Sequence, residues 1–218
     1  MFSHIHPDNY AEQLSDKQVD MAKLFSDFDL PTLDIFHSVA INYRQRAEFR
    51  VWHDDDDIYY IMFDTITKKK FKVEDFPVAS VLINTAMKAL LIFIKNRPEL
   101  RYKLFQVDFL SSLSGELLIS MLYHKQLEDT WQIAAEELKQ KLSHIADIDI
   151  IGRAKKQKVI VDKDYITESL QVNNKTYFYQ QVENSFTQPN AGVNEKMLSW
   201  AKQATMNDGG DLIELYCG

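Results

Sequence analysis

Two histidine-containing stretches have residue types that could bind a metal. His4 and His6 lie two residues apart near the N-terminus, and His53 directly precedes the four aspartates at 54–57. Two histidines near a chain end lack a third fixed ligand, and an aspartate run in a turn is usually solvated, whereas metal sites need converging ligands and supporting hydrogen bonds. We therefore expect no metal centre here.

Cys217 is the only thiol and therefore the only candidate for thiolate chemistry. It lies in the apolar run DLIELYCG at 211–218 with no histidine near it in sequence, where a cysteine behaves as a small buried hydrophobe. One cysteine also excludes an internal disulfide framework and a four-cysteine zinc or iron–sulfur site. A reducing cytoplasm is the expected location.

A basic and aromatic stretch at 44–52 could bind nucleic acid. If it is a strand, alternation places one set of side chains on one face: Arg44, Arg46, Glu48, Arg50 and Trp52. The other face then carries Tyr43, Ala47, Phe49 and Val51. Guanidinium groups pair with phosphate and stack on bases. The alternative is a solvated outer sheet face. Basic clusters at 68–72 and 153–158 favour nucleic acid, and the net charge of −7 argues mildly against it.

The composition is that of an ordinary globular protein. At 218 residues, 45% of them hydrophobic and 26% charged, the chain can form one large domain or one domain plus part of another. The longest apolar stretch, at 89–94, is too short to span a bilayer, and residues 1–17 lack the basic and apolar regions of a signal peptide. We expect a cytoplasmic protein that does not contact membranes.

Hydrophobic periodicity predicts the elements that would position these residues. Helices are expected at 8–29, 78–94, 127–143 and 193–206. Strands are expected at 44–53, 58–64, 70–76, 102–110, 116–124, 147–152, 158–162, 175–180 and 211–217. Gly115 marks the turn of a hairpin. Hairpins followed by a helix and a last strand indicate an α+β fold, rich in antiparallel sheet with flanking helices, that ends in the beginning of an α/β unit.

Several motifs resemble those of one known family. They are YRQRAEFRVWH at 43–53, LFQVDFL at 104–110, MLYHK at 121–125, DIIGRAKKQK at 149–158, QVENSFTQPNAGVN at 181–194 and DLIELYCG at 211–218. The chain is similar, almost end to end, to the bacterial tRNA (uracil-5-)-methyltransferases, which use S-adenosylmethionine to make 5-methyluridine in the T-loop. The pairing of ENSFTQPN with a helix and LIELYCG is the most specific part of this resemblance.

The resemblance implies an RNA-binding domain over 1–180 and the beginning of a Rossmann-like α/β methyltransferase domain over 181–218. In the family, ELYCG continues into the loop that holds S-adenosylmethionine. We therefore expect the chain to be the N-terminal part of a longer enzyme, with the nucleophilic cysteine and the general base beyond Gly218. Cys217 is then not the nucleophile, and these 218 residues alone are expected to be inactive. Related rRNA methyltransferases carry a four-cysteine iron–sulfur cluster, so the tRNA branch fits better.

The same resemblance implies the chemistry and the cofactor contacts. The full enzyme would attack C6 of uracil with a thiolate, C5 would then take the methyl group, and a carboxylate would remove the C5 proton. Gln188 and Tyr216 match family positions that contact S-adenosylmethionine, and no catalytic residue is expected within the chain. A module that binds or remodels tRNA without chemistry is the alternative function.

The resemblance also implies residues that face RNA. Glu48, Arg50, Phe105 and His124 match positions near the flipped T-loop, and we add Arg44 and Arg46 from the basic face. The ring of Phe105 can fill the place that a uridine leaves in the base stack, which makes base extrusion cheaper. We expect the T-arm of tRNA and the tRNA-like part of tmRNA as partners, and a monomeric protein.

Overall fold

The computed structural model describes residues 5–29, 31–64, 66–206, 209–211 and 213. Its centre is a seven-stranded sheet with the order β3-β2-β1-β4-β5-β6-β7, in which β5 and β6 are parallel and the other neighbours antiparallel. The strands are β1 (Arg46–Asp54), β2 (Asp57–Phe63), β3 (Lys70–Val73), β4 (Leu104–Ser111), β5 (Glu116–Tyr123), β6 (Asp147–Ala154) and β7 (Gln157–Ile160). A second sheet pairs β8 (Tyr165–Val172) with β9 (Lys175–Val182). The predicted α+β class is confirmed.

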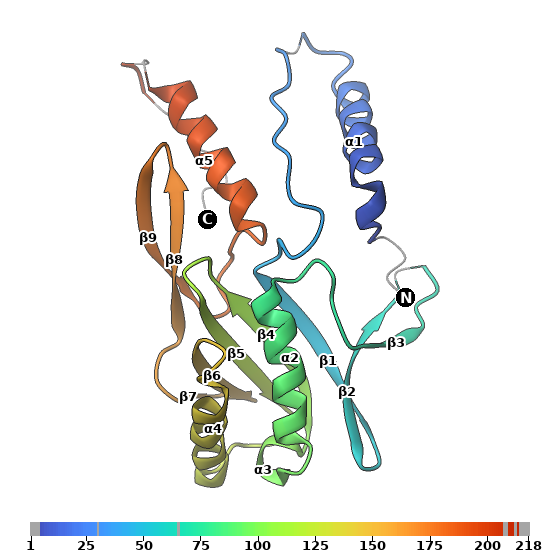
Figure 1. The fold of residues 1–218 in the computed structure, drawn as a ribbon, viewed down its shortest axis with the longest axis vertical. Helices are drawn as coiled ribbons and strands as arrows, with labels where there is room; N and C mark the ends of the chain where they lie inside the picture. Colours follow the sequence, from blue (N-terminus) through green and yellow to red (C-terminus); the bar gives the residue numbers. More distant parts are fainter. Residues whose placement is uncertain (1–4, 30, 65, 207–208, 212, 214–218) are drawn as a thin grey trace.

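Three helices lie over one face of the seven-stranded sheet, as Figure 1 shows. They are α2 (Val81–Ile94), α3 (Pro98–Arg101) and α4 (Asp129–Leu142). Helix α4 connects the two parallel strands, which cannot be joined by a tight turn. The residues predicted for its inner face are all buried: Trp131, Ala134, Ala135, Leu138 and Leu142. Gly152 of β6 permits this packing, because a Cβ there would lie 2.5 Å from Leu127 Cδ1 and from the Trp131 ring.

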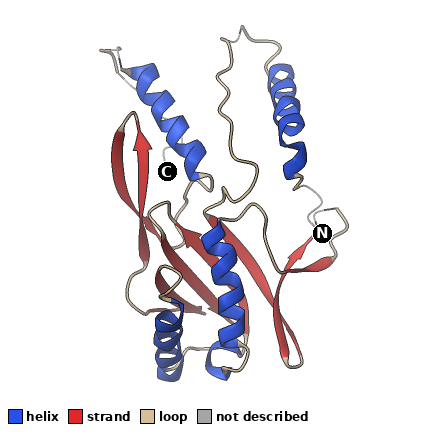
Figure 2. Ribbon diagram, in the orientation of Figure 1, coloured by secondary structure: helices blue, strands red, loops and turns tan. Residues whose placement is uncertain are grey.

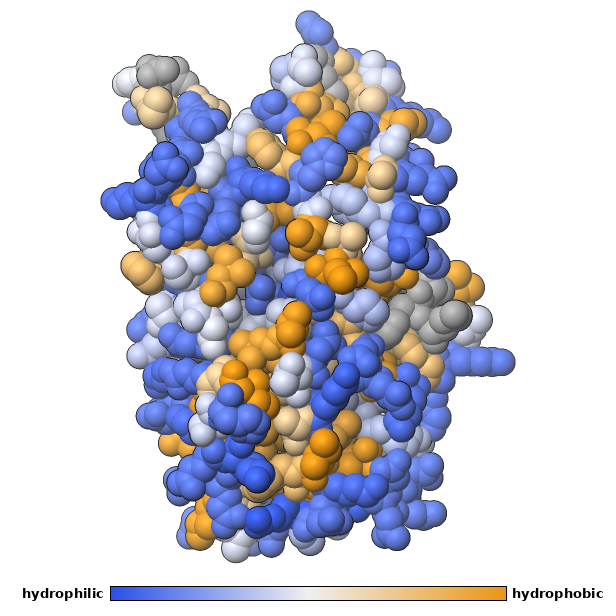
Figure 3. All heavy atoms as spheres, in the orientation of Figure 1, coloured by the Kyte–Doolittle hydropathy of each residue, from blue (hydrophilic) through white to orange (hydrophobic). Residues whose placement is uncertain are grey.

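The core lies between these helices and the sheet. The Phe49 ring lies at its centre, 5.4 Å from Tyr60, 5.6 Å from Phe76 and 6.2 Å from Phe109 between ring centroids. Ala47 and Val51, its alternate neighbours on β1, are also buried, as the sequence predicts. The intervening side chains of β1 therefore point to the opposite side of the sheet, which we call the open face. Figure 3 shows apolar side chains over α2 on the helical side.

The remaining helices lie beyond one end of the seven-stranded sheet. They are α1 (Tyr10–Leu24), which follows the short 3-10 helix η1 (Pro7–Asn9), and α5 (Ala191–Thr205). A long loop connects α1 to β1 (Figure 2). This loop is attached to α5, because Trp200 Nε1 donates to Asp34 Oδ2 at 2.7 Å and Lys196 Nζ donates to the His37 carbonyl at 2.5 Å. Helix α5 itself packs against β8.

Several expected boundaries are wrong. The helix expected at 8–29 ends at Leu24, and the helix expected from Val78 begins at Val81, where the Ser80 hydroxyl accepts a hydrogen bond from Ile83 N. The strand expected from Arg44 begins at Arg46. Arg44 instead forms isolated bridges to two distant segments, and backbone pairing there replaces continuation of the strand.

Strand β8 is not predicted by hydrophobic periodicity, because its sequence, YITESLQV, is too polar to show a clear alternation. Glu168 at its centre is fully buried, and burial raises the pKa of its carboxyl, while Oε1 accepts hydrogen bonds from the backbone of Leu113 and Ser169 that oppose this shift. The strand expected at 211–217 lies largely outside the described residues.

Candidate nucleic-acid interface

Phe105 and His124 come together at an irregularity between β4 and β5. Leu104 pairs with Tyr123 and Gln106 with Leu122, so Phe105 is an extra residue in β4. Bulges of this kind redirect a side chain and are common beside functional sites. The two rings are stacked, with centroids 3.9 Å apart and planes at 10°. Because Phe105 is half-buried and His124 is exposed, the pair presents an aromatic surface to solvent.

Arg50 joins this aromatic pair from the neighbouring strand. It pairs with Gln106 across the β1–β4 ladder, and its guanidinium carbon lies 5.6 Å from the centroid of the Phe105 ring, within the range of a cation–π contact. Arg50 is exposed. We call Arg50, Phe105 and His124 the open-face cluster. A cation beside an exposed aromatic stack can hold both a phosphate and a base.

The other two arginines predicted for this surface make contacts within the protein. Arg46 forms an ion pair with Glu48 at 3.1 Å and donates through Nη1 to the Ser185 carbonyl at 2.8 Å. Arg44 lies outside β1 and donates through Nε to the Arg46 carbonyl at 2.7 Å. The structure therefore brings Arg50, but not all three arginines, to the open-face cluster.

The two basic clusters at 68–72 and 153–158 differ in the contacts that their side chains make. The Arg153 guanidinium and Lys158 contact Glu183, and Arg153 lowers the pKa of that carboxyl although burial alone would raise it. Arg153 and Lys158 are thus paired with a carboxylate, whereas Lys155 and Lys156 of the same cluster are exposed. Lys70 remains on the open face, with its Nζ 3.1 Å from the centroid of the Trp52 ring. The basic and aromatic character of the open face therefore continues from β1 to β3.

Asp108 is a titratable residue of the open face that the sequence pattern alone does not identify as part of a site. It pairs with Glu48 on β1 and with Ser120 on β5. Burial raises the pKa of Asp108 to about 6, and the negative charges of Glu48 and Glu183 add to this shift, whereas a 2.8 Å hydrogen bond from Gln106 opposes it. The sequence offers one indication of this contact: Asp108 is two residues from Gln106 in a strand, so the two side chains lie on the same face.

The raised pKa of Asp108 predicts how stability depends on pH. Because the folded state binds this proton more tightly than the unfolded state, the free energy of unfolding should fall as the pH rises from about 4 through about 6. In an Asp108→Asn variant this contribution is absent. The variant should therefore gain stability relative to the wild type between about pH 4 and about pH 7.5, as measured by urea unfolding.

Asp20→Asn, a change at an exposed position of α1, provides the control and should give no such gain. An Asp108→Asn variant whose stability difference from the wild type is the same at both pH values would contradict the assignment.

The loop 183–190 carries Gln188 and is attached to the start of β1. Gln45 N donates to the Pro189 carbonyl at 2.7 Å, and Arg46 holds Ser185 as described above. Gln188 is exposed between these two fixed points. The adjacent Thr187 hydroxyl is buried and has no hydrogen-bond partner within the described part of the chain. Tyr216 and Cys217 lie outside the described residues.

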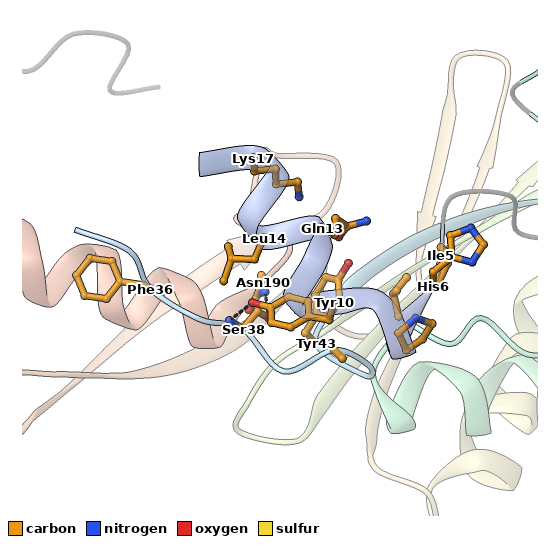
Figure 4. Close-up of a pocket in the computed structure, with 13 residues that line it drawn as sticks. Ile5, His6, Tyr10, Gln13, Leu14, Lys17, Phe36, Ser38, Tyr43 and Asn190 are labelled. Atoms are coloured by element: carbon orange, nitrogen blue, oxygen red, sulfur yellow. Dashed lines mark hydrogen bonds between the residues drawn. The ribbon is translucent and has the colours of Figure 1, made fainter. Parts of the chain in front are cut away.

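A pocket of about 330 Å³ lies next to Asn190, the residue that precedes and caps α5 (Figure 4). Asn190 caps α5 by accepting from Val193 N at 3.0 Å, and its Nδ2 donates to Ser38 Oγ at 2.7 Å. The Tyr10 hydroxyl of α1 accepts from Ser38 N at 2.7 Å. These contacts attach α1 and the long loop to the chain directly after Gln188.

His53, which precedes the aspartates at 54–57, contacts the backbone of β4. His53 Nε2 hydrogen-bonds to the Leu104 carbonyl at 2.7 Å, and no group of three or more histidine, cysteine, aspartate or glutamate side chains suited to a metal is found among the described residues. None of the helices within those residues is long and apolar enough to cross a membrane.

The chain belongs to the tRNA (Uracil-5-)-methyltransferase family, whose model matches residues 9–218. Among its curated relatives, the tRNA/tmRNA (uracil-C(5))-methyltransferase of Colwellia psychrerythraea is 77% identical over 218 residues, which are 100% of this chain and 60% of that protein. The proteins of the same name from Shewanella baltica and Vibrio cholerae are 55% identical over 212 residues and 54% identical over 215 residues. These matches cover 97% and 98% of this chain and 58% of each relative. The chain therefore spans about 60% of the length of these relatives.

Proposed function

We propose that this chain is the RNA-binding part, and the beginning of the catalytic part, of an S-adenosylmethionine-dependent enzyme that methylates C5 of uridine in the T-loop of tRNA. The observation that carries the proposal is the family match over residues 9–218, together with relatives named for tRNA and tmRNA. On that basis we propose that the whole protein acts on both tRNA and tmRNA. We also propose that it is a cytoplasmic monomer.

The open face is our proposed RNA surface. Its cluster offers one cation, Arg50, and an aromatic stack, Phe105 on His124, which suit a phosphate and an unstacked base. The helical side is less suitable, because its exposed residues include large apolar side chains such as Ile92, which is 78% exposed. A T-loop uridine that leaves its stack would thus meet an aromatic surface at the beginning of β4.

The methyl donor is proposed to contact the loop 183–190. S-adenosylmethionine supplies an activated methyl group when bound. Gln188 is suited to hydrogen-bond such a ligand, because its amide is exposed on a loop fixed at Ser185 and Pro189. The buried Thr187 hydroxyl beside it has no hydrogen-bond partner among the described residues, which is consistent with a site that further residues complete. Tyr216 remains our second proposed contact.

We place the domain boundary near residue 180, so that 1–180 form the RNA-binding domain and 181–218 begin a Rossmann-like methyltransferase domain. This division is supported by the end of β9 at Val182, after which the loop 183–190 leads into α5. The nucleophilic cysteine and the general base are proposed to belong to the remaining length of the family's proteins.

Binding and methyl transfer test this proposal in one set of samples. The purified chain should bind a T-arm hairpin more tightly than a D-arm hairpin of equal length, as measured by fluorescence anisotropy. It should transfer no label from methyl-labelled S-adenosylmethionine to either RNA, because we propose that the reacting thiolate lies elsewhere in the enzyme. Equal affinity for both hairpins would contradict T-arm recognition, and methyl transfer by the chain alone would contradict the proposed division of labour.

A further inference from the structure

Arg46 contacts two parts of the molecule that are far apart in sequence. Its Nε and Nη2 donate to Glu48 Oε1 on the open face at 3.3 and 3.1 Å, and its Nη1 donates to the Ser185 carbonyl at 2.8 Å. The planar guanidinium can hold both partners at once because its donors form a rigid fork. One side chain therefore bridges the proposed RNA surface and the loop that carries Gln188.

The contact to Ser185 is one of three successive attachments between this loop and the start of β1. Arg44 forms a backbone bridge with Asn190, and Gln45 N donates to Pro189, so the C-terminal end of the loop is held by backbone contacts. The attachment at Ser185 is made by a side chain instead. Because the same side chain also contacts Glu48, a change on the open face can alter this attachment.

We propose that Arg46 is a positioning residue that couples RNA binding on the open face to the conformation of loop 183–190. This inference rests on the proposed function. The Arg46 and Glu48 side chains are 24% and 49% exposed, so RNA that covers them removes water from a partly hydrated ion pair. Their attraction then strengthens in the lower dielectric and orients the guanidinium toward Ser185. RNA binding would thereby fix the loop that presents Gln188 to the methyl donor.

Hydrogen exchange of the amides at 184–188, with and without a T-arm hairpin, tests this coupling. In the wild-type chain RNA should slow their exchange. Arg46→Lys keeps the charge but loses the fork, so exchange in the free protein should be about tenfold faster, as expected when a charge-assisted hydrogen bond is lost, and RNA should no longer slow it. A role confined to stability would change the exchange of the free protein but not its response to RNA.

Glu48→Gln provides a second variant that leaves Arg46 and Ser185 in place. Its loop should exchange at the wild-type rate without RNA but respond less to RNA. Arg97→Lys on the helical side is the matched control and should behave as the wild type does. RNA that binds without slowing the wild-type loop, or an Arg46→Lys variant with the full response, would overturn the coupling. Anisotropy in the same samples separates this outcome from a failure of the wild type to bind RNA, which would overturn the proposed function.

Discussion

A Phe105→Ala variant should bind a T-arm hairpin about 1–3 kcal/mol more weakly than the wild type, because an RNA base loses its aromatic stacking partner. The loss should leave the salt dependence of binding nearly unchanged, since no cation is removed. The structure adds a reason for a large effect. His124 is stacked on Phe105 at 3.9 Å, so removing one ring also removes the support of the other. Anisotropy titrations at several salt concentrations measure both quantities.

Two further variants of aromatic residues make this prediction specific. Phe105→Trp retains a stacking surface and should restore most of the affinity. Phe178→Ala removes a phenyl ring that is 70% exposed on β9, a strand of the second sheet, and should leave binding unchanged. If Phe178→Ala weakens binding as much as Phe105→Ala does, the aromatic contribution is not localised at the bulge in β4.

An Arg50→Ala variant should weaken binding by about 1.5–3 kcal/mol, the range for a hydrogen bond to a charged group. It should also make the plot of log affinity against log salt concentration shallower by about 0.7–0.9, because one phosphate contact no longer releases counterions. The two variants of the open-face cluster are thus expected to differ in kind. Phe105→Ala lowers affinity at an unchanged salt slope, whereas Arg50→Ala changes both.

Arg97→Ala is the matched control for the lost charge. Arg97 pairs with Glu137 at 2.7 Å on the helical side of the sheet, so its removal changes the net charge equally. Its salt slope should equal that of the wild type. A shallower slope in both arginine variants would mean that RNA responds to total charge and not to the position of Arg50.

The local parts of the fold could be predicted from the sequence. Alternation in β1 correctly placed Phe49 inside and Arg50 outside, and the helical period of α4 correctly placed Trp131 inside. Both patterns reflect burial of one face of one element. Strand β8 could not be predicted in this way, because Glu168 occupies a buried position and the partners that satisfy it come from the tertiary structure.

The candidate site was only partly predictable for a similar reason. The strand pattern selected the arginines, and the resemblance selected Phe105 and His124, which the structure places in one stack. No local pattern predicts the bulge that turns Phe105 to the open face. The contact between Arg46 and Ser185 joins residues 139 positions apart, so it can be recognised only after the chain has folded.

The most direct test of the central claim is a map of where RNA touches the protein. A T-arm hairpin with 4-thiouridine in its loop would be photo-crosslinked to the wild-type chain, and the crosslinked peptides identified by mass spectrometry. Our proposal predicts crosslinks in β1, in β4 around Phe105 and in the segment at His124. Crosslinks confined to α2 and α4, on the opposite side of the sheet, would contradict the assignment of the open face as the RNA surface.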